Sequence, residues 1–561
     1  MKFRLPAIAA ALLCCLSCVE TRYEVGSNLL PIEQRYKTYT LDIPIEELSV
    51  KMADSLSGYH QTRITIGAVK DEEFGLTTRG SAMTLVPMFS ESLDLGKPGT
   101  RKAKRFHFAA EFDTTSFAAS NQKHILQRVH VYPLNKAITK DDYDCNGKVE
   151  YGSFKGISGD IALGSPVANG SDSLSFNLSL DYAQYFLDNM TDEDFKDYNK
   201  FIAKFPGIYI NTETPAVNDK GRINCYKLQI AYDSEYYYVT GNYATLTYSA
   251  EFKDADGKWA PKDTTIMFYY GADDFYDLDS LLTKGTAGSY PEYALNLTGY
   301  EDRTGKHTID VSDKSTFTVE GGGGYKPVVS ASYLRKSVMD EIKKNISEND
   351  LMIEDTSKVI VHKASIVLPF EFPEDYTLMN RYPAYMSPVC RIRTESKHVN
   401  YVNISDSSMS SENQGDIDRS NLWYSPDITY HMQEILLSKK DADLSNYDIW
   451  LLILANETVT TTSSGNSDLS EYYQYLAYQS YYSSMYGGYG GYGGYGSYGS
   501  SYYNNYYSYM LASMYAGGST TTETTTALDK ERYYRALFHG PQWSDKKSRP
   551  SFRIVYSLPV E

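Results

Sequence analysis

Cysteine is scarce in this chain of 561 residues, and its six cysteines do not form a disulfide framework. Cys14, Cys15 and Cys18 lie together near the N-terminus, whereas Cys145, Cys225 and Cys390 are far apart in the sequence. Three widely separated cysteines can form one bridge at most, so we expect three buried single thiols. Because 42% of the residues are hydrophobic, the chain can bury sizeable cores without disulfides.

Positive charge is also in deficit. The chain has 54 Lys and Arg against 71 Asp and Glu, which gives a formal net charge of −17. Nucleic-acid-binding proteins need a basic surface to offset phosphate charge, so this balance argues against a nucleic-acid partner. After the N-terminal segment no stretch approaches 18 uncharged apolar residues, so we expect no membrane-spanning helix.

Motifs of the common catalytic and cofactor sites are missing. None of the nine histidines forms an H-E-x-x-H motif or a Cys/His metal cluster, and no G-x-S-x-G or Walker A motif occurs. We therefore predict that the protein is not an enzyme and holds no cofactor. The one weak metal candidate is a calcium loop with Asp142, Asp144 and Asn146 as ligands. Its twelfth position is Ser153, which supplies no bidentate carboxylate, and Asn146-Gly147 is also typical of a plain hairpin turn.

The dominant positive signal is a series of short strands between turn residues. Runs rich in Val, Ile, Thr, Phe and Tyr, such as 63–69, 105–112 and 551–556, predict a mainly β protein built from two β-sandwich, jelly-roll-like regions. Asp256-Gly257 predicts a hairpin between 244–252 and 264–270. Helical spacing predicts a few short helices, at 191–205 and 332–344. Gly321–Gly324 is either a flexible join or a tight strand-to-strand bend. We place the division near 325, with one sandwich at 35–325 and the other at 326–561.

Tyrosine is abundant, with 53 residues, and many of them lie in one segment. Residues 472–522 contain no charge and are rich in Tyr, Gly and Ser, which predicts a long disordered insertion at about 459–528. The apolar run 449–455 before it and the run 533–538 after it suggest an insertion between two paired strands. The segment is either a contact surface or inert low-complexity sequence. Tyr236–Tyr238 are a second candidate contact surface. Within the insertion, the tyrosines of the repeat that could form a contact surface are Tyr486, Tyr489, Tyr492, Tyr495 and Tyr498.

The N-terminus predicts export and lipid anchoring. Lys2 and Arg4 precede an apolar run that is too short to span a bilayer, which is typical of a signal peptide over 1–17. The run ends in Leu16-Ser17-Cys18, which resembles a bacterial lipobox, although Cys15 stands where Leu is usual. The resemblance implies lipidation of Cys18, where several acyl chains would each add about 0.8 kcal/mol per buried CH₂ group. Residues 18–34 would then be a tether.

Several segments in order resemble a Bacteroidota outer-membrane lipoprotein family, catalogued as domain of unknown function 4270. They are Val25–Pro31, Thr65–Thr77, Phe205–Ile210, Val319–Gly324, Val361–Ile366 and Phe552–Tyr556. The resemblance implies a lipoprotein of the outer membrane with no established activity, and it offers no catalytic residues to carry over to this chain. A looser resemblance, carried by the closing strand Arg549–Tyr556, is to secreted jelly-roll modules, some of which bind polysaccharide.

The family resemblance also makes O-glycosylation relevant, because exported proteins of this phylum carry glycans at Asp-Ser/Thr motifs. Five motifs occur, and bulky sugar belongs on exposed turns. The acceptor residues would be Ser55, Thr114, Ser173, Thr264 and Ser280.

Taken together, these features predict a non-catalytic, lipid-anchored binding or adhesion module for glycan or protein. The alternative is a periplasm-facing structural partner of a cell-envelope assembly. The residues after Cys18, Val19-Glu20-Thr21-Arg22, lack the acidic run that often precedes surface export, so the face of the outer membrane is left open.

Overall fold

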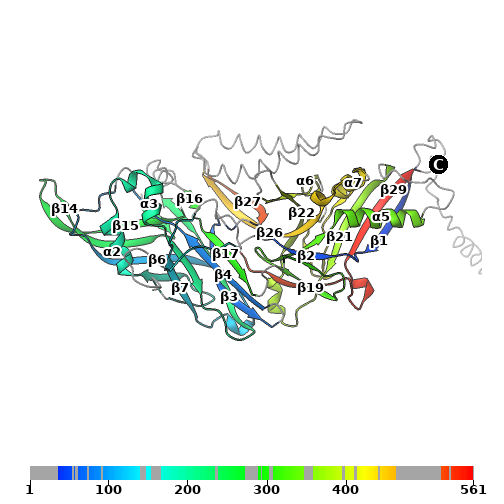
Figure 1. The fold of residues 1–561 in the computed structure, drawn as a ribbon, viewed down its shortest axis with the longest axis horizontal. Helices are drawn as coiled ribbons and strands as arrows, with labels where there is room; N and C mark the ends of the chain where they lie inside the picture. The colour runs from blue at the N-terminus through cyan, green and yellow to red at the C-terminus, as the bar shows by residue number, and fades with distance from the viewer. Residues whose placement is uncertain are drawn as a thin grey trace, which may run out of the picture.

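A computed structural model describes most of the chain. The described residues are 36–53, 56, 58, 61–72, 75–89, 93–138, 147–152, 164, 166–233, 238–271, 288–291, 293–301, 307–345, 358–393, 399–409, 413–439, 442–462, 520–529 and 532–559. The fold is mainly β with a few short helices, as the sequence predicts, and every pairing between the described strands is antiparallel. Two sandwich-like bodies lie side by side along the long axis of the molecule (Figure 1). No helix among the described residues is both long and apolar enough to cross a membrane.

The first sandwich is built on a 12-stranded sheet in which the long strand β6 lies between β14 and β11. Its buried side chains form one large core, closed on one side by α2 (Leu180–Asn189), the 3-10 turn η4 (Asp194–Lys196) and α3 (Tyr198–Lys204). The strands are β3 (Arg63–Asp71), β4 (Gly75–Met83), β5 (Leu85–Pro87), β6 (Lys102–Phe117), β7 (Gln127–Pro133), β8 (Val167–Ala168), β9 (Leu174–Leu178), β10 (Ile208–Thr212), β11 (Lys220–Lys227), β14 (Ala244–Lys253), β15 (Trp259–Tyr270) and β17 (Leu295–Tyr300). A three-stranded sheet adds β12 (Gln229–Asp233), β13 (Tyr238–Gly241) and β16 (Gly288–Pro291).

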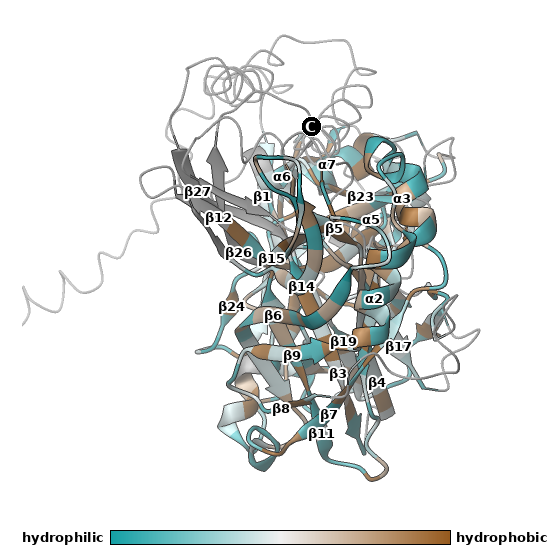
Figure 2. Cartoon of the chain, turned by 90° about the vertical axis from the view of Figure 1, so that its left-hand side faces the viewer, coloured by the Kyte–Doolittle hydropathy of each residue, from teal (hydrophilic) through white to brown (hydrophobic). Residues whose placement is uncertain are grey.

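The predicted hairpin is present: β14 pairs with β15 from Ala244↔Phe268 to Lys253↔Trp259. Residues alternate between buried and more exposed along β14, as expected of a strand with one face on the core. Figure 2 shows this alternation as brown and teal bands along β14.

The second sandwich contains a five-stranded and a seven-stranded sheet, with a short two-stranded sheet beside them. Helices α5 (Ala331–Asn345), α6 (Asp406–Met409) and α7 (Thr429–Leu437) belong to this body. The strands are β1 (Tyr36–Pro44), β2 (Ser49–Met52), β18 (Thr308–Asp310), β19 (Thr316–Glu320), β20 (Tyr325–Val329), β21 (Ile360–Pro369), β22 (Tyr385–Arg393), β23 (Val399–Asn403), β24 (Ile417–Asp418), β25 (Trp423–Tyr424), β26 (Ile449–Thr462), β27 (Thr520–Leu528), β28 (Arg535–His539) and β29 (Ser551–Pro559).

Strand pairing divides the chain differently from the predicted boundary at 325. Strand β1 pairs with β29 over nine residues, and β2 pairs with β20, so the start of the described chain belongs to the second sandwich. Strands β18 and β19 belong there as well. Alternation along a strand tells which side chains are buried but not which distant strand lies beside it. A single domain boundary near 325 therefore does not describe this arrangement, in which the first sandwich is inserted between β2 and β18.

The glycine-rich segment is a tight bend between β19 and β20, which settles the alternative left open by the sequence. The ammonium of Lys326 donates to the carbonyl oxygens of Gly322 at 2.9 Å and Gly324 at 3.1 Å, and also to that of Glu320. Gly322 has a φ of +55°, and a Cβ there would lie 2.6 Å from the guanidinium of Arg79. A flexible join at this point is therefore wrong.

Both predicted helical segments are helical in the structure, but one of them is divided into two elements. The predicted helix 332–344 is confirmed as α5. The predicted helix 191–205 is split into η4 and α3, because Asp197 has extended backbone and its carboxylate caps α3 by accepting from Asn199 N at 3.1 Å. Helix α2 was missed.

The Tyr/Gly-rich insertion joins two strands that pair with each other. Strand β26 pairs with β27 from Leu454↔Leu528 to Thr462↔Thr520. The predicted partner 533–538 is wrong, because that run forms β28 and pairs with β19. Residues 463–519, with the repeated tyrosines, lie outside the described residues.

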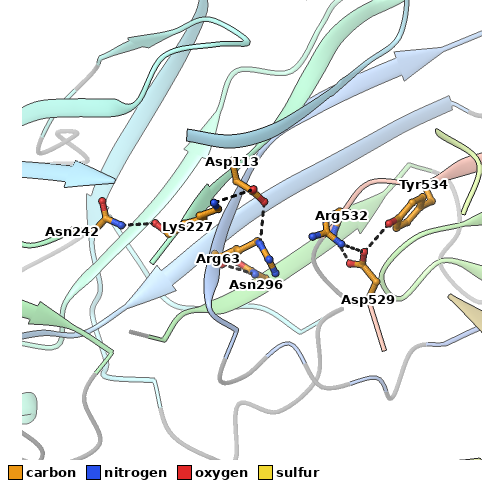
Figure 3. A network of polar contacts seen from close by, with 8 residues as sticks. All are labelled: Arg63, Asp113, Lys227, Asn242, Asn296, Asp529, Arg532 and Tyr534. Carbon is orange, nitrogen blue, oxygen red and sulfur yellow. Dashed lines mark hydrogen bonds and ion pairs between the residues drawn. The ribbon is translucent and has the colours of Figure 1, made fainter. Parts of the chain in front are cut away.

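The two sandwiches meet at a buried polar junction. Arg535 of β28 lies 3.4 Å from the carboxylate of Glu320, and its guanidinium also donates to Thr77 of β4 at 2.5 Å. Arg381 lies 3.9 Å from Asp71 across the same junction. Figure 3 shows the neighbouring groups: Asp113 accepts from Arg63, and Asp529 binds both Arg532 and Tyr534. Of these contacts, Arg535–Thr77 and Arg381–Asp71 join side chains of both bodies, so they hold the two sandwiches together.

Candidate functional site

Most of the residues that the sequence singles out lie outside the described residues. They are Cys18, Ser55, Asp142, Asp144, Asn146, Tyr236, Tyr237, Ser280, Tyr486, Tyr489, Tyr492, Tyr495 and Tyr498. Lipidation of Cys18, the calcium loop and the tyrosine repeat therefore stay predictions. Tyr238 is the first residue of β13.

Three of the five candidate glycan acceptors are described. Thr114 is exposed but lies within β6, opposite Cys225 of β11. Thr264 is half-buried within β15, opposite Tyr248. Ser173 is exposed just before β9, after a turn in which Asn169 Oδ1 accepts from Ser171 N and Asp172 N. Because glycans need an accessible turn, Ser173 is the acceptor whose surroundings fit best.

Two of the expected single thiols are confirmed, since Cys225 and Cys390 are free and buried. Cys390 Sγ lies 3.8 Å from His431 Nε2, a pairing that resembles a nucleophile and its base. Burial raises the pKa of the Cys390 thiol and lowers the pKa of His431 to about 4, so both groups are neutral at pH 7. His431 Nε2 is also 2.9 Å from the carbonyl oxygen of Tyr447. This pair is a packed core contact and not a thiolate nucleophile.

The neutral thiol gives a direct prediction. In the native protein, Cys390 should react with iodoacetamide at least about 100-fold more slowly than after unfolding in guanidinium, because the thiolate is suppressed and the side chain is buried. Peptide mass spectrometry of alkylated samples measures this residue by residue. Fast native labelling of Cys390 would contradict the assignment and reopen a catalytic role.

A small polar cavity lies at the N-terminus of α7, with a volume of about 10 Å³, room for a single water. Asp406 lines it and caps the helix by accepting from Tyr430 N at 2.7 Å and His431 N at 2.9 Å. Burial raises the pKa of Asp406 to about 6. The cavity is too small for an organic ligand, so we assign Asp406 to helix capping.

The surface best suited to a ligand is a row of aromatic rings on the outside of the first sandwich. We define the tyrosine face as His130, Tyr132, Tyr151 and Tyr209. The ring centroids of Tyr132 and Tyr151 are 5.1 Å apart, and those of Tyr151 and Tyr209 are 4.6 Å apart. His130 lies 6.0 Å from Tyr132. Tyr151 is 42% exposed, so the middle of the row is open to a partner.

Strand alternation explains why these rings point outward. Val129 and Val131 of β7 and Ile208 and Ile210 of β10 are fully buried in the core, so the residues between them face the other way. The register places Tyr209 opposite Tyr132 and Asn211 opposite His130. The isolated bridge between Leu134 and Tyr151 brings the third ring beside them.

A glycine in the neighbouring strand provides the space for this row. A Cβ on Gly80 of β4 would lie 2.2 Å from the hydroxyl oxygen of Tyr209, so Tyr209 packs against bare backbone. Burial raises the pKa of Tyr209, which keeps the phenol neutral. The ring is thus held in place as a rigid, uncharged platform.

Charged groups border the tyrosine face beside His130. The carboxylate of Glu213 lies 3.2 Å from Arg128 and 3.5 Å from His130, and both Arg128 and Glu213 are exposed. Among the described residues of the chain, no three His, Cys, Asp or Glu side chains are grouped so as to hold a metal ion. The face can stack on a ring and form hydrogen bonds through phenol and amide groups.

Comparison with known proteins adds no assignment: no family model matches the sequence, and no curated protein or solved structure is significantly similar to it.

Sequence reasoning missed the tyrosine face because its rings come from three separate segments. Only His130 and Tyr132, two residues apart in one strand, carry a local signal of an outward aromatic pair. The pairing of β7 with β10 and the bridge to Tyr151 bring the row together.

Proposed function

We propose that this protein is a non-catalytic, lipid-anchored binding or adhesion module of the outer membrane, and that it binds glycan or protein at the tyrosine face. The observation that carries the proposal is the row of neighbouring, partly exposed rings on the outside of a rigid sheet. Aromatic side chains offer a large contact area that loses little conformational freedom on binding. The proposed lipid at Cys18 rests on the lipobox and family resemblance.

The position of the first described strand supports this arrangement. Tyr36 pairs with Pro559, and β1 and β29 lie at the end of the second sandwich that is remote from β14 (Figure 1). Seventeen residues separate Cys18 from Tyr36, which reach about 60 Å at most when fully extended. Anchoring through this end would leave the first sandwich as the part that extends from the membrane toward a ligand.

Loss of the central ring should weaken binding. We expect Tyr151→Ala to lower the affinity for the ligand at least about tenfold, equivalent to about 1.4 kcal/mol, because it removes the ring that both neighbours contact. Affinity electrophoresis of the full mature chain in gels containing β-glucan, galactomannan or mucin measures the effect. Tyr430→Ala is a matched control, since Tyr430 is 43% exposed but lies on α7 of the second sandwich. Equal retardation of both variants and the unchanged protein in every gel would refute the role of the tyrosine face.

Protease treatment of intact cells distinguishes a location on the cell surface from one in the periplasm. An adhesion module on the surface should be cleaved while a periplasmic control protein survives. Protection until the outer membrane is opened would instead favour the alternative, a periplasm-facing structural partner of an envelope assembly. Chemical cross-linking in the periplasm would then identify that partner.

A further inference from the structure

The end of the molecule that is remote from β1 and β29 carries an exposed tryptophan between two lysines. Trp259 begins β15, is 46% exposed and lies at the tip of the β14–β15 hairpin (Figure 1). The ammonium nitrogens of Lys97 and Lys253 lie 5.5 Å and 5.4 Å from the centre of its ring. An aromatic ring with two fixed cations beside it combines a stacking surface with charge recognition.

The hairpin turn holds this arrangement in place. Asp254 Oδ1 accepts from Asp256 N at 3.0 Å and Lys258 N at 2.8 Å, and Asp254 N donates to Lys258 O. The turn thereby fixes the register that sets Lys253 directly opposite Trp259. The two side chains therefore share one face of the hairpin.

Lys97 reaches the ring from a separate segment that is also held in place. Its ammonium pairs with Glu251 at 2.9 Å, and its backbone N donates to Glu251 O at 2.8 Å. Thr100 Oγ1 accepts from Glu251 N at 3.0 Å. Both lysines thus flank Trp259 from structured backbone.

The tip is basic, although the chain as a whole is acidic. The segments 94–105 and 249–263 contain eight Lys or Arg and five Asp or Glu, whereas the whole chain has a net charge of −17. Most of the acids are engaged: Glu251 with Lys97, Asp263 with Lys104 at 2.6 Å, and Asp94 and Asp254 with backbone N–H groups. The exposed lysines that leave the tip positive are Lys102, Lys253, Lys258 and Lys262.

We propose that this tip binds an acidic polysaccharide, with a sugar ring stacked on Trp259 and ring carboxylates paired with Lys253. Two observations favour a polymer over a membrane surface. Trp259 is the only large hydrophobic side chain that the described part of the tip exposes, so little apolar area could enter a bilayer. Along the same face, Glu251 and Asp263 are paired with Lys97 and Lys104, and Ser249 and Thr247 are polar, so the face offers polar contacts to a linear chain of sugars. This inference extends the proposed binding role to a second surface and does not depend on the tyrosine face.

The test compares two forms of one polymer. Polygalacturonate carries a carboxylate on every sugar, and its methyl ester has the same backbone without that charge. We expect the full mature chain to bind polygalacturonate at least about tenfold more tightly than the ester, and the difference to shrink as salt is added. Titration calorimetry over a range of salt concentrations measures both effects.

Two variants address the ring and the charge separately. Trp259→Ala and Lys253→Gln should each weaken polygalacturonate binding by about fivefold or more, and neither side chain is buried. Matched controls are Tyr376→Ala, which removes a 75%-exposed ring on the second sandwich, and Lys220→Gln, which removes an exposed lysine from the first. Both controls should bind like the unchanged protein.

Three results would overturn the proposal. Equal affinity for polygalacturonate and its ester would exclude recognition of the carboxylates. Unchanged binding by both Trp259→Ala and Lys253→Gln would place the polymer elsewhere. Binding to phosphatidylglycerol vesicles that depends on Trp259, without binding to polygalacturonate, would assign the tip to a lipid surface.

Discussion

Replacing Arg535 with methionine should lower the free energy of unfolding by about 3–5 kcal/mol. The Arg535 side chain is fully buried at the junction of the two sandwiches and lies 3.4 Å from the carboxylate of Glu320, which is 1% exposed. The substitution would leave that carboxylate charged and buried, with its hydrogen bond from Tyr325 N as a remaining contact. Removing one partner of a buried ion pair is far more costly than the loss of an ion pair in water.

Urea titration followed by circular dichroism measures this effect. Arg128→Met is the matched control, because Arg128 pairs with Glu213 at 3.2 Å but both side chains are more than half exposed. We expect the control to change the unfolding free energy by no more than about 0.5 kcal/mol. The double variant Arg535→Met with Glu320→Leu should recover part of the loss, because it removes both charges. If Arg535→Met behaved like Arg128→Met, the junction would have to be open to water in solution.

Lowering the pH from 6.5 to 4 should reduce the free energy of unfolding through His431. Burial lowers the pKa of His431 to about 4, whereas an unfolded histidine titrates near 6.5. Above pH 6.5 both states are neutral and the contribution is fully present. As the pH falls from 6.5 to 4 the unfolded chain takes up the proton first, so about 3 kcal/mol of stability is lost. His431→Gln, which keeps a donor for Tyr447 O, should lack this loss.

The measurement is the difference in unfolding free energy between the two proteins at a series of pH values. Asp406, whose pKa is raised to about 6, titrates in the opposite sense: its contribution grows as the pH falls from 6 toward 4. It is present in both proteins and therefore largely cancels in the difference. If the unfolding free energies of the unchanged protein and of His431→Gln changed with pH in parallel, His431 would not be buried as it is in the structure.

The positions of strands could be predicted from local sequence to a large extent. Ala244–Phe252 and Thr264–Tyr270 form the predicted hairpin, and 332–344 forms the predicted helix, because periodicity and turn residues act over a few neighbours. The split of 191–205 at Asp197 and the omission of α2 show the limit of this reasoning. There, capping and core packing determine where a helix begins and ends.

The candidate surfaces could not be predicted in the same way. Tyr132, Tyr151 and Tyr209 come together through the pairing of β7 with β10 and one further bridge, and Gly80 of a fourth segment provides the space beneath them. Lys97 and Trp259 are also far apart in the chain. The abundance of tyrosine pointed instead to the repeat that lies outside the described residues.

By itself, the sequence determined that this is a mainly β protein without a disulfide framework, with an export signal as its expected N-terminus. Composition and short-range alternation carry that information, because burial on one face of a strand requires it. The tertiary structure alone decided that β1 and β2 close the second sandwich and that Arg535 meets Thr77 across the junction. It also decided that exposed rings gather at the tyrosine face. These features depend on which distant strands pair, and strand pairing is chosen by the packing of the whole core and not by any local pattern.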